Sequence, residues 1–114
     1  EFEKMLIEDE VHIIKFWFSI SKSEQKRRFI KRITNPLKSW KFSNVDLESQ
    51  NKWDLYTKYK KKMFNKTSTA YSPWVNIKSN SKLNARIESI KYVLSRFEIS
   101  KSNIKVDDRI ISSI

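Results

Sequence analysis

The chain has 114 residues, a formal net charge of +11, and neither glycine nor cysteine. A chain without glycine cannot form a phosphate-cradling loop, a dinucleotide-binding turn or a nucleophile elbow, because each needs glycine where the backbone approaches a ligand or takes a positive φ. A chain without cysteine, in which His12 is the only histidine, also excludes disulfides, thiol catalysis and the usual Cys/His zinc site.

The charge is unevenly distributed along the sequence. Residues 1–10 carry five acidic side chains and one lysine, whereas residues 22–62 carry thirteen basic side chains and four acidic ones. The partner of this middle region should be an anion, and nucleic acid, membrane headgroups, a nucleotide or inorganic polyphosphate would each satisfy the charge. No apolar run is long enough to cross a bilayer and no signal peptide is present, so we expect a cytoplasmic protein without a membrane partner.

The first predicted elements are a helix end and a strand. Apolar residues at helical spacing in residues 1–9 predict the last turns of an amphipathic helix, and because the chain opens there without methionine we expect that its beginning is missing. Val11 to Ile20 is nearly continuously apolar, which is typical of a strand buried on both faces of a parallel sheet. Lys15 within it either reaches the sheet edge along its aliphatic stem, which we favour, or faces a ligand. We interpret His12 as structural.

A basic helix is predicted directly after this strand. Ser21 and Glu24 form a capping box, which favours a helix start, and Asn35-Pro36 ends the helix because the residue before proline is excluded from the helical region.

Two adjacent rows of positive charge lie along this basic helix. Each row is a pair of residues four positions apart: Arg27 with Lys31, and Arg28 with Arg32. Like charges at that spacing repel, so we expect a polyanion to lie across them. A solvated cationic surface helix is the alternative interpretation.

The second half of the chain predicts two more helices and a strand. Ser43 with Asp46 opens a long helix to about Asn65, whose lysines 58 and 60–62 we interpret as a solvated face. Residues 67–73 are predicted as a loop and residues 74–77 as a strand. The last helix has an apolar stripe that we expect to pack on the sheet, formed by Leu83, Ile87, Ile90, Leu94 and Phe97. Residues 98–114 are predicted as an irregular tail with a short strand near Arg109 to Ile111.

These elements predict an α/β fold with an incomplete sheet. Two strands are too few to bury both faces of the first one. We therefore interpret the chain as the C-terminal part of a larger domain, whose remaining strands precede it or come from another chain.

Many residues of the chain resemble, in order and spacing, the C-terminal half of the polyphosphate kinase 2 family. The similarity covers Phe2 to Phe97, and the residues that carry it are Ile14–Ser21, Glu24-Gln25, Arg28-Phe29, Arg32, Asn35–Lys38, Trp40-Lys41, Asp46–Glu48, Trp53, Tyr56, Met63, Thr67–Thr69 and Pro73-Trp74. The resemblance implies a P-loop kinase-like, three-layer α/β/α domain. Residues 1–97 would form its C-terminal part with a helical lid at roughly 22–66, and residues 98–114 the tail.

The resemblance also implies an activity and its partners. Members of this family transfer a phosphoryl group between inorganic polyphosphate and a nucleoside diphosphate or monophosphate, with Mg²⁺. Their phosphate-binding loop and acidic magnesium ligands lie in the N-terminal half, so we predict no metal ligand here and expect this chain to be inactive alone. Its expected partners are polyphosphate, a nucleotide, the missing N-terminal half of the domain and further copies in a homo-oligomer.

The candidate site residues are the cations of the lid region. Phosphoryl transfer depends mostly on positioning and on charge stabilisation, so a lid needs cations directed at phosphate oxygens. We assign catalytic roles to Arg28 and Arg32, which can bind phosphate bidentately, and polyphosphate or nucleotide binding to Lys38, Lys41, Arg27 and Lys31. We interpret Trp40 as a hydrophobic anchor of the lid rather than a stacking platform, and Asp46 as a helix cap that could also orient a lid cation.

Two other functions fit part of this pattern. Basic helices with interspersed tryptophan and tyrosine also bind RNA and single-stranded DNA, so a nucleic-acid-binding module is the main alternative. A degenerate fragment that is kept as a partner-binding piece is the third. Displacement of a nucleic acid by a far lower concentration of polyphosphate would favour the kinase.

Overall fold

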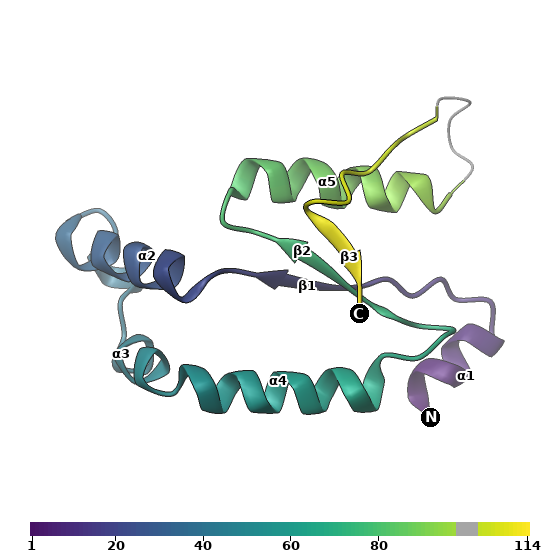
Figure 1. The fold of residues 1–114 in the computed structure, drawn as a ribbon, viewed down its shortest axis with the longest axis horizontal. Helices are drawn as coiled ribbons and strands as arrows, with labels where there is room; N and C mark the ends of the chain where they lie inside the picture. The colour runs from purple at the N-terminus through teal and green to yellow at the C-terminus, as the bar shows by residue number, and fades with distance from the viewer. Residues whose placement is uncertain (98–102) are drawn as a thin grey trace. The chain divides into compact units, whose positions relative to one another are not determined.

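The computed structural model describes residues 1–97 and 103–114. The elements follow in the order α1 (Phe2–Glu8), β1 (Lys15–Ser19), α2 (Lys22–Thr34), the 3-10 helix η1 (Ser39–Lys41), α3 (Asn44–Asn51), α4 (Trp53–Thr67), β2 (Trp74–Lys78), α5 (Lys82–Ser95) and β3 (Ile111–Ser113) (Figure 1). They form two compact units, Glu1–Ser19 with Met63–Ile114, called the sheet unit, and Ile20–Lys62, called the helical unit. The end of α4 belongs to the sheet unit and the rest of α4 to the helical unit.

The sheet unit is built on three strands in the order β1-β2-β3. β1 and β2 are parallel, with Lys15 opposite Trp74, and β3 is antiparallel to β2. The predicted strand from Val11 to Ile20 is shorter than expected, because the five residues of β2 give partners only to residues 15–19. The strand predicted at residues 74–77 is present, and the one predicted near Arg109 to Ile111 lies slightly later, in β3.

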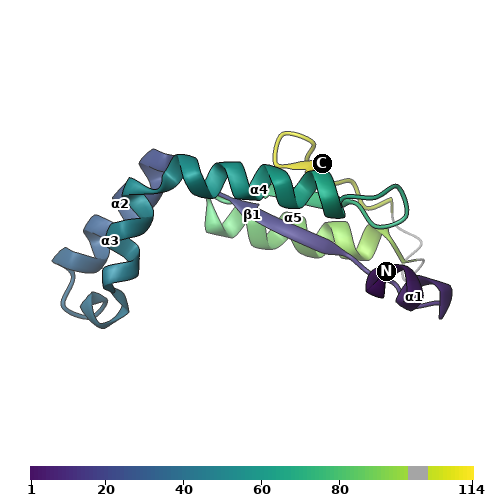
Figure 2. The same ribbon diagram turned by 90° about the horizontal axis from the view of Figure 1, so that it is seen from below.

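The core lies between the sheet and α5, which runs along one face of the strands (Figures 1 and 2). Its buried apolar side chains are Val75, Ile77, Ala85 and Ile111, and Phe16 and Tyr92 pack against them. Glu88 on α5 is also buried, and its carboxylate accepts hydrogen bonds from the Asp107 backbone N–H at 2.7 Å and from Lys91 Nζ at 2.8 Å. The segment before β3 is therefore joined to α5, which the fading sequence pattern did not predict.

The predicted packing face of α5 is wrong. Leu83, Ile87 and Ile90 are 64%, 43% and 61% exposed, whereas Ala85 and Glu88 are buried. Residue 85 follows residue 83 by about 200° around the helix, so the sheet contacts the side opposite the stripe. Periodicity identified an apolar stripe but could not show that α5 has a second side with a small residue, on which the strands approach.

The opposite face of the sheet contains Lys15, which is only 8% exposed. Its Nζ lies 2.8 Å from Glu3 Oε2, donates to the carbonyl oxygen of Thr67 at 2.5 Å and lies 5.4 Å from the Trp74 ring centroid. Thr67 is the last residue of α4, so the ammonium also stabilises the negative end of that helix. The structural interpretation of Lys15 is thus confirmed. His12 lies outside the strand, and its exposed ring contacts Phe97 edge-on at 5.4 Å.

The helical unit begins with the predicted basic helix. Ser21 caps α2 and its Oγ accepts a hydrogen bond from the Glu24 backbone N–H at 3.2 Å; the helix ends at Asn35. The single helix predicted from Ser43 to Asn65 is wrong, because Lys52 takes φ −102° and ψ 16° between α3 and α4. This one-residue break leaves α3 as a separate short helix beside α2, where Gln50 Nε2 donates to Gln25 Oε1 at 3.0 Å.

No side chain of residues 20–62 is fully buried. The helical unit is held by polar contacts and by a Phe29–Phe42 ring contact at 6.4 Å rather than by an apolar core of its own. Such a unit belongs to the low-stability end of a structure, where local rearrangement costs little. Among the described helices, none has the length and hydrophobicity needed to cross a membrane.

Candidate anion-binding site

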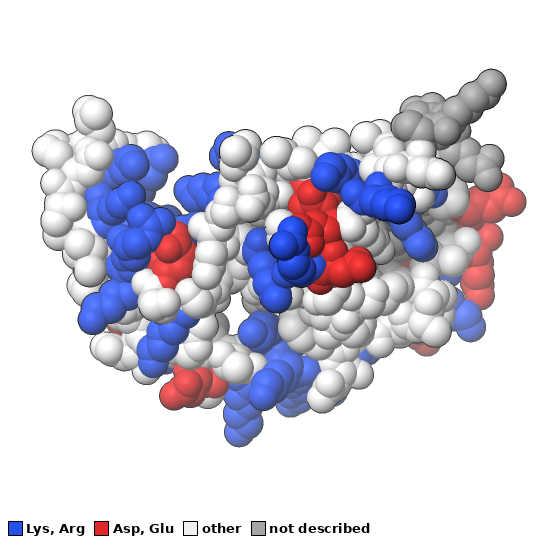
Figure 3. All heavy atoms as spheres, turned by 45° about the horizontal axis from the view of Figure 1, so that its top comes forward, with Lys and Arg blue, Asp and Glu red and all other residues white. Residues whose placement is uncertain are grey.

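The helical unit contains all six cations predicted to bind phosphate. Four lie on α2, Lys38 precedes η1 and Lys41 ends it. Figure 3 shows blue side chains gathered around a smaller red group over α2 and α3. The site can therefore be built from two acidic residues, Glu24 and Asp46, and the cations around them.

Glu24 binds two of the arginines on α2. Its Oε2 accepts from Arg27 Nε at 2.7 Å, and its Oε1 accepts from Arg27 Nη2 at 2.6 Å and from Arg28 Nε at 2.7 Å. Hydrogen bonds from Arg27 and Arg28 lower the pKa of Glu24 to about 2, so the carboxylate stays ionised at physiological pH. The repulsion predicted between the charge rows is therefore partly offset within the chain.

Asp46 binds the third arginine. Its Oδ2 accepts from Arg32 Nη1 at 3.2 Å and from the Ser43 backbone N–H at 3.1 Å. Both roles weighed for Asp46, helix cap and orienter of a lid cation, are thus present in one carboxylate. The Arg32 guanidinium also lies 5.4 Å from the Phe29 ring centroid, which fixes its direction further.

The two arginines assigned catalytic roles are thus bound to carboxylates of their own unit. Their side chains keep 22% (Arg28) and 35% (Arg32) exposure. An anion that binds either guanidinium must share it with Glu24 or Asp46, or displace that carboxylate. The catalytic assignment remains a prediction.

The lysines of the site are more accessible than the arginines. Lys31, Lys38 and Lys41 are exposed, and none of them forms a salt bridge within the part of the chain that the structure describes. Lys41 Nζ lies 4.9 Å from the ring centroid of Trp40. Trp40 is 77% exposed and its Nε1 donates to the Leu37 carbonyl oxygen at 3.1 Å, so this chain does not bury it as the hydrophobic anchor we expected.

Sequence reasoning missed the role of Glu24 in the site. Its spacing of three and four residues from Arg27 and Arg28 was a visible signal, because side chains at those separations meet on a helix. The Arg32–Asp46 contact joins residues 14 positions apart and had no such local signal.

The residues present do not fit a magnesium site. Nowhere in residues 1–97 and 103–114 do three or more histidine, aspartate or glutamate side chains gather in a way that could hold a metal ion. Glu24 and Asp46 are already bound to arginines. Six cations against two carboxylates can instead bind a chain of phosphates, which needs no fixed sequence or shape.

Comparison with known proteins identifies similar chains. The sequence model of the family described as Polyphosphate kinase 2 matches residues 1–105. The GDP-polyphosphate phosphotransferase of Mycolicibacterium smegmatis is 44% identical over 105 residues, which cover 92% of this chain and 37% of that protein. The ADP-polyphosphate phosphotransferase of Pseudomonas aeruginosa is 39% identical over 113 residues, covering 96% of this chain and 37% of that one.

A solved structure has the same fold. The crystal structure of Polyphosphate Kinase 2 from Arthrobacter aurescens TC1 superimposes with a TM-score of 0.73 and 35% sequence identity, covering 92% of this chain and 39% of that one. The present chain thus spans less than two-fifths of the length of these relatives.

Proposed function

Because this chain belongs to the polyphosphate kinase 2 family, we propose that it is the basic, lid-containing part of an enzyme that transfers a phosphoryl group between inorganic polyphosphate and a nucleoside diphosphate. The observation that carries the proposal is the cluster of six cations around two carboxylates in the helical unit. The names of the relatives, with GDP in one and ADP in the other, support a nucleoside diphosphate as substrate and leave the base open.

In this proposal the helical unit binds and positions phosphates. Lys31, Lys38 and Lys41 are exposed and would meet polyphosphate first, by charge alone. Arg28 and Arg32 would then exchange their carboxylate contacts for phosphate oxygens and stabilise the charge of the transferring group. The lack of a buried core in residues 20–62 supports this role, since a lid must rearrange at little cost.

The remaining machinery would come from outside residues 1–114. This chain has no glycine for a phosphate-binding loop, and its described residues do not fit a magnesium site. We therefore propose that the chain alone does not catalyse transfer, and that the magnesium ligands and the phosphate-binding loop belong to a preceding or separate N-terminal part of the domain.

The test is a chimera in which residues 1–114 replace the matching part of the Mycolicibacterium smegmatis relative. Polyphosphate-dependent phosphorylation of GDP should be measurable, and Arg28→Ala or Arg32→Ala should lower turnover by up to roughly 10³-fold while the melting temperature stays nearly constant. Arg86→Ala, at an exposed position on α5, is the matched control and should retain activity. Parallel losses of activity and stability would show that Arg28 and Arg32 are structural. Displacement of polyphosphate by RNA at equal concentration would favour the nucleic-acid-binding alternative.

A further inference from the structure

The two edges of the sheet differ in composition. β3 is three residues long, and its exposed Ser112 and Ser113 suit a terminal strand. β1 reads Lys-Phe-Trp-Phe-Ser and, among the described residues, pairs only with β2. Natural edge strands are protected by charge, proline or a bulge. β1 has no such protection, because its one charged side chain, Lys15, is buried against Glu3.

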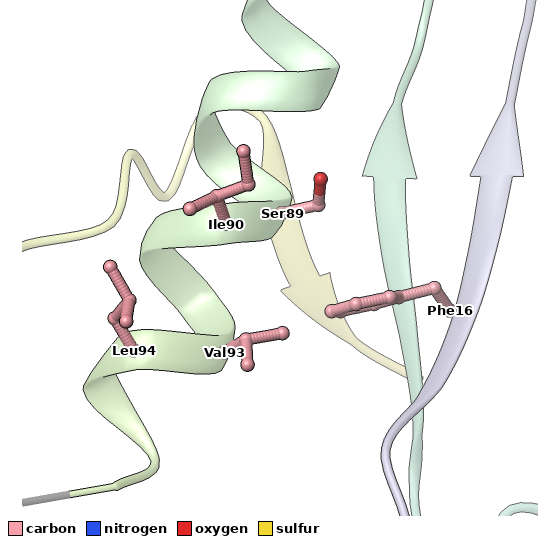
Figure 4. Close-up of a pocket in the computed structure, with 5 residues that line it drawn as sticks. All are labelled: Phe16, Ser89, Ile90, Val93 and Leu94. Carbon is pink, nitrogen blue, oxygen red and sulfur yellow. The ribbon is translucent and has the colours of Figure 1, made fainter. Parts of the chain in front are cut away.

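An apolar groove accompanies this unprotected edge. It has a volume of about 240 Å³ and is lined by Phe16, Ser89, Ile90, Val93 and Leu94. In Figure 4 the ring of Phe16 extends from β1 toward α5, and Ser89 and Val93 point back toward it.

The groove lies on the β1 side of α5. Glu88 marks the other side of the helix, because its carboxylate binds the Asp107 N–H in the segment that leads to β3. Phe18, two residues beyond Phe16 on the same face of β1, is 54% exposed, and Ile90 is 61% exposed. Unpaired backbone and uncovered apolar side chains thus occur together along one edge.

We infer that the free edge of β1 pairs with a β-strand from the part of the domain that this chain does not span, and that an apolar side chain of that strand fills the groove beside Phe16. The length of the relatives supports this occupant, since the chain covers only 39% of the solved neighbour. β3 already occupies the other edge, which leaves β1 as the place of attachment. The inference rests on the proposed function only for the existence of a further part of the domain.

The experiment compares the isolated chain with the chimera described above. The backbone amides of residues 15–19 that do not bond to β2 should exchange with solvent at least about tenfold more slowly in the chimera. Phe18→Lys and Ile90→Lys change side chains that are exposed in the isolated chain, so its melting temperature should not change. In the chimera each should lower the melting temperature by about 5 °C or more, because a charge would be buried without a partner. Leu37→Lys, in the helical unit and 83% exposed, is the control and should alter neither protein.

Two results would overturn the inference. Equal exchange in chain and chimera would show that the edge stays open. Protection that grows with the concentration of the isolated chain would show that a second copy covers it. Turnover is a separate readout: an inactive chimera with a protected edge would refute the proposed function and leave this inference standing.

Discussion

Replacing Glu24 by glutamine removes the carboxylate that binds Arg27 and Arg28 but keeps its size. A phosphate oxygen bonded to either arginine would lie about 2.8 Å beyond the guanidinium, which itself lies 2.6 Å from Glu24 in the case of Arg27. The phosphate and the carboxylate would thus be about 6 Å apart. Coulomb repulsion at that distance changes affinity by about threefold at the dielectric of water and by about 100-fold at an effective dielectric of about 20. We expect Glu24→Gln to raise polyphosphate affinity between these limits.

Isothermal titration of the chain with polyphosphate, at about 50 and 200 mM salt, measures this gain. The gain should shrink at the higher salt because the charges are partly exposed. Glu48→Gln is the matched control: Glu48 lies in the same helical unit, pairs with Lys52 at 2.9 Å and loses the same charge. An equal gain in both variants would show that only net charge matters, and no gain from Glu24→Gln would refute the competition between carboxylate and phosphate.

Three further predictions concern stability. Ile77→Ala, at a fully buried position of β2, should lower the free energy of unfolding by about 2–5 kcal/mol in chemical denaturation; a loss below about 1 kcal/mol would place the core elsewhere. Asp46→Ala should cost about 1–2 kcal/mol by removing a cap and an ion pair, and the control Asp54→Ala at most half of that; equal losses would contradict the dual role. Arg109 lowers the pKa of Asp107 from 3.8 to about 2, so their contact should be complete above pH 4 and lost as pH falls toward 2. The NMR shift of the Asp107 carboxyl carbon follows this, and a transition above pH 5 would contradict it.

The sequence predicted best where structure is decided locally. The boundaries of α2 follow from Ser21 and Asn35-Pro36, because capping and the restriction before proline act within a few residues. The strands at residues 74–77 and near residue 111 were also found from short apolar runs between turn signals. The break at Lys52 was missed because a one-residue interruption leaves the apolar period almost unchanged.

Features that depend on contacts between distant residues could not be predicted. The length of β1 is fixed by its partner β2, and the packing face of α5 by the side from which the strands approach. In the site, the cations were identified from charge and spacing, yet their partners were not. Arg32 finds Asp46 only after α3 has folded beside α2, so no local pattern contains that pair.

The position of Asp46 has a consequence for how Arg32 can be released. One oxygen, Oδ2, accepts from both the Ser43 amide and the guanidinium. A competing anion that removes the guanidinium leaves this oxygen with a backbone donor and with solvent, so no isolated charge is created. Departure of the arginine is therefore decoupled from the integrity of α3: the helix keeps its first hydrogen bond whether the guanidinium is docked or withdrawn.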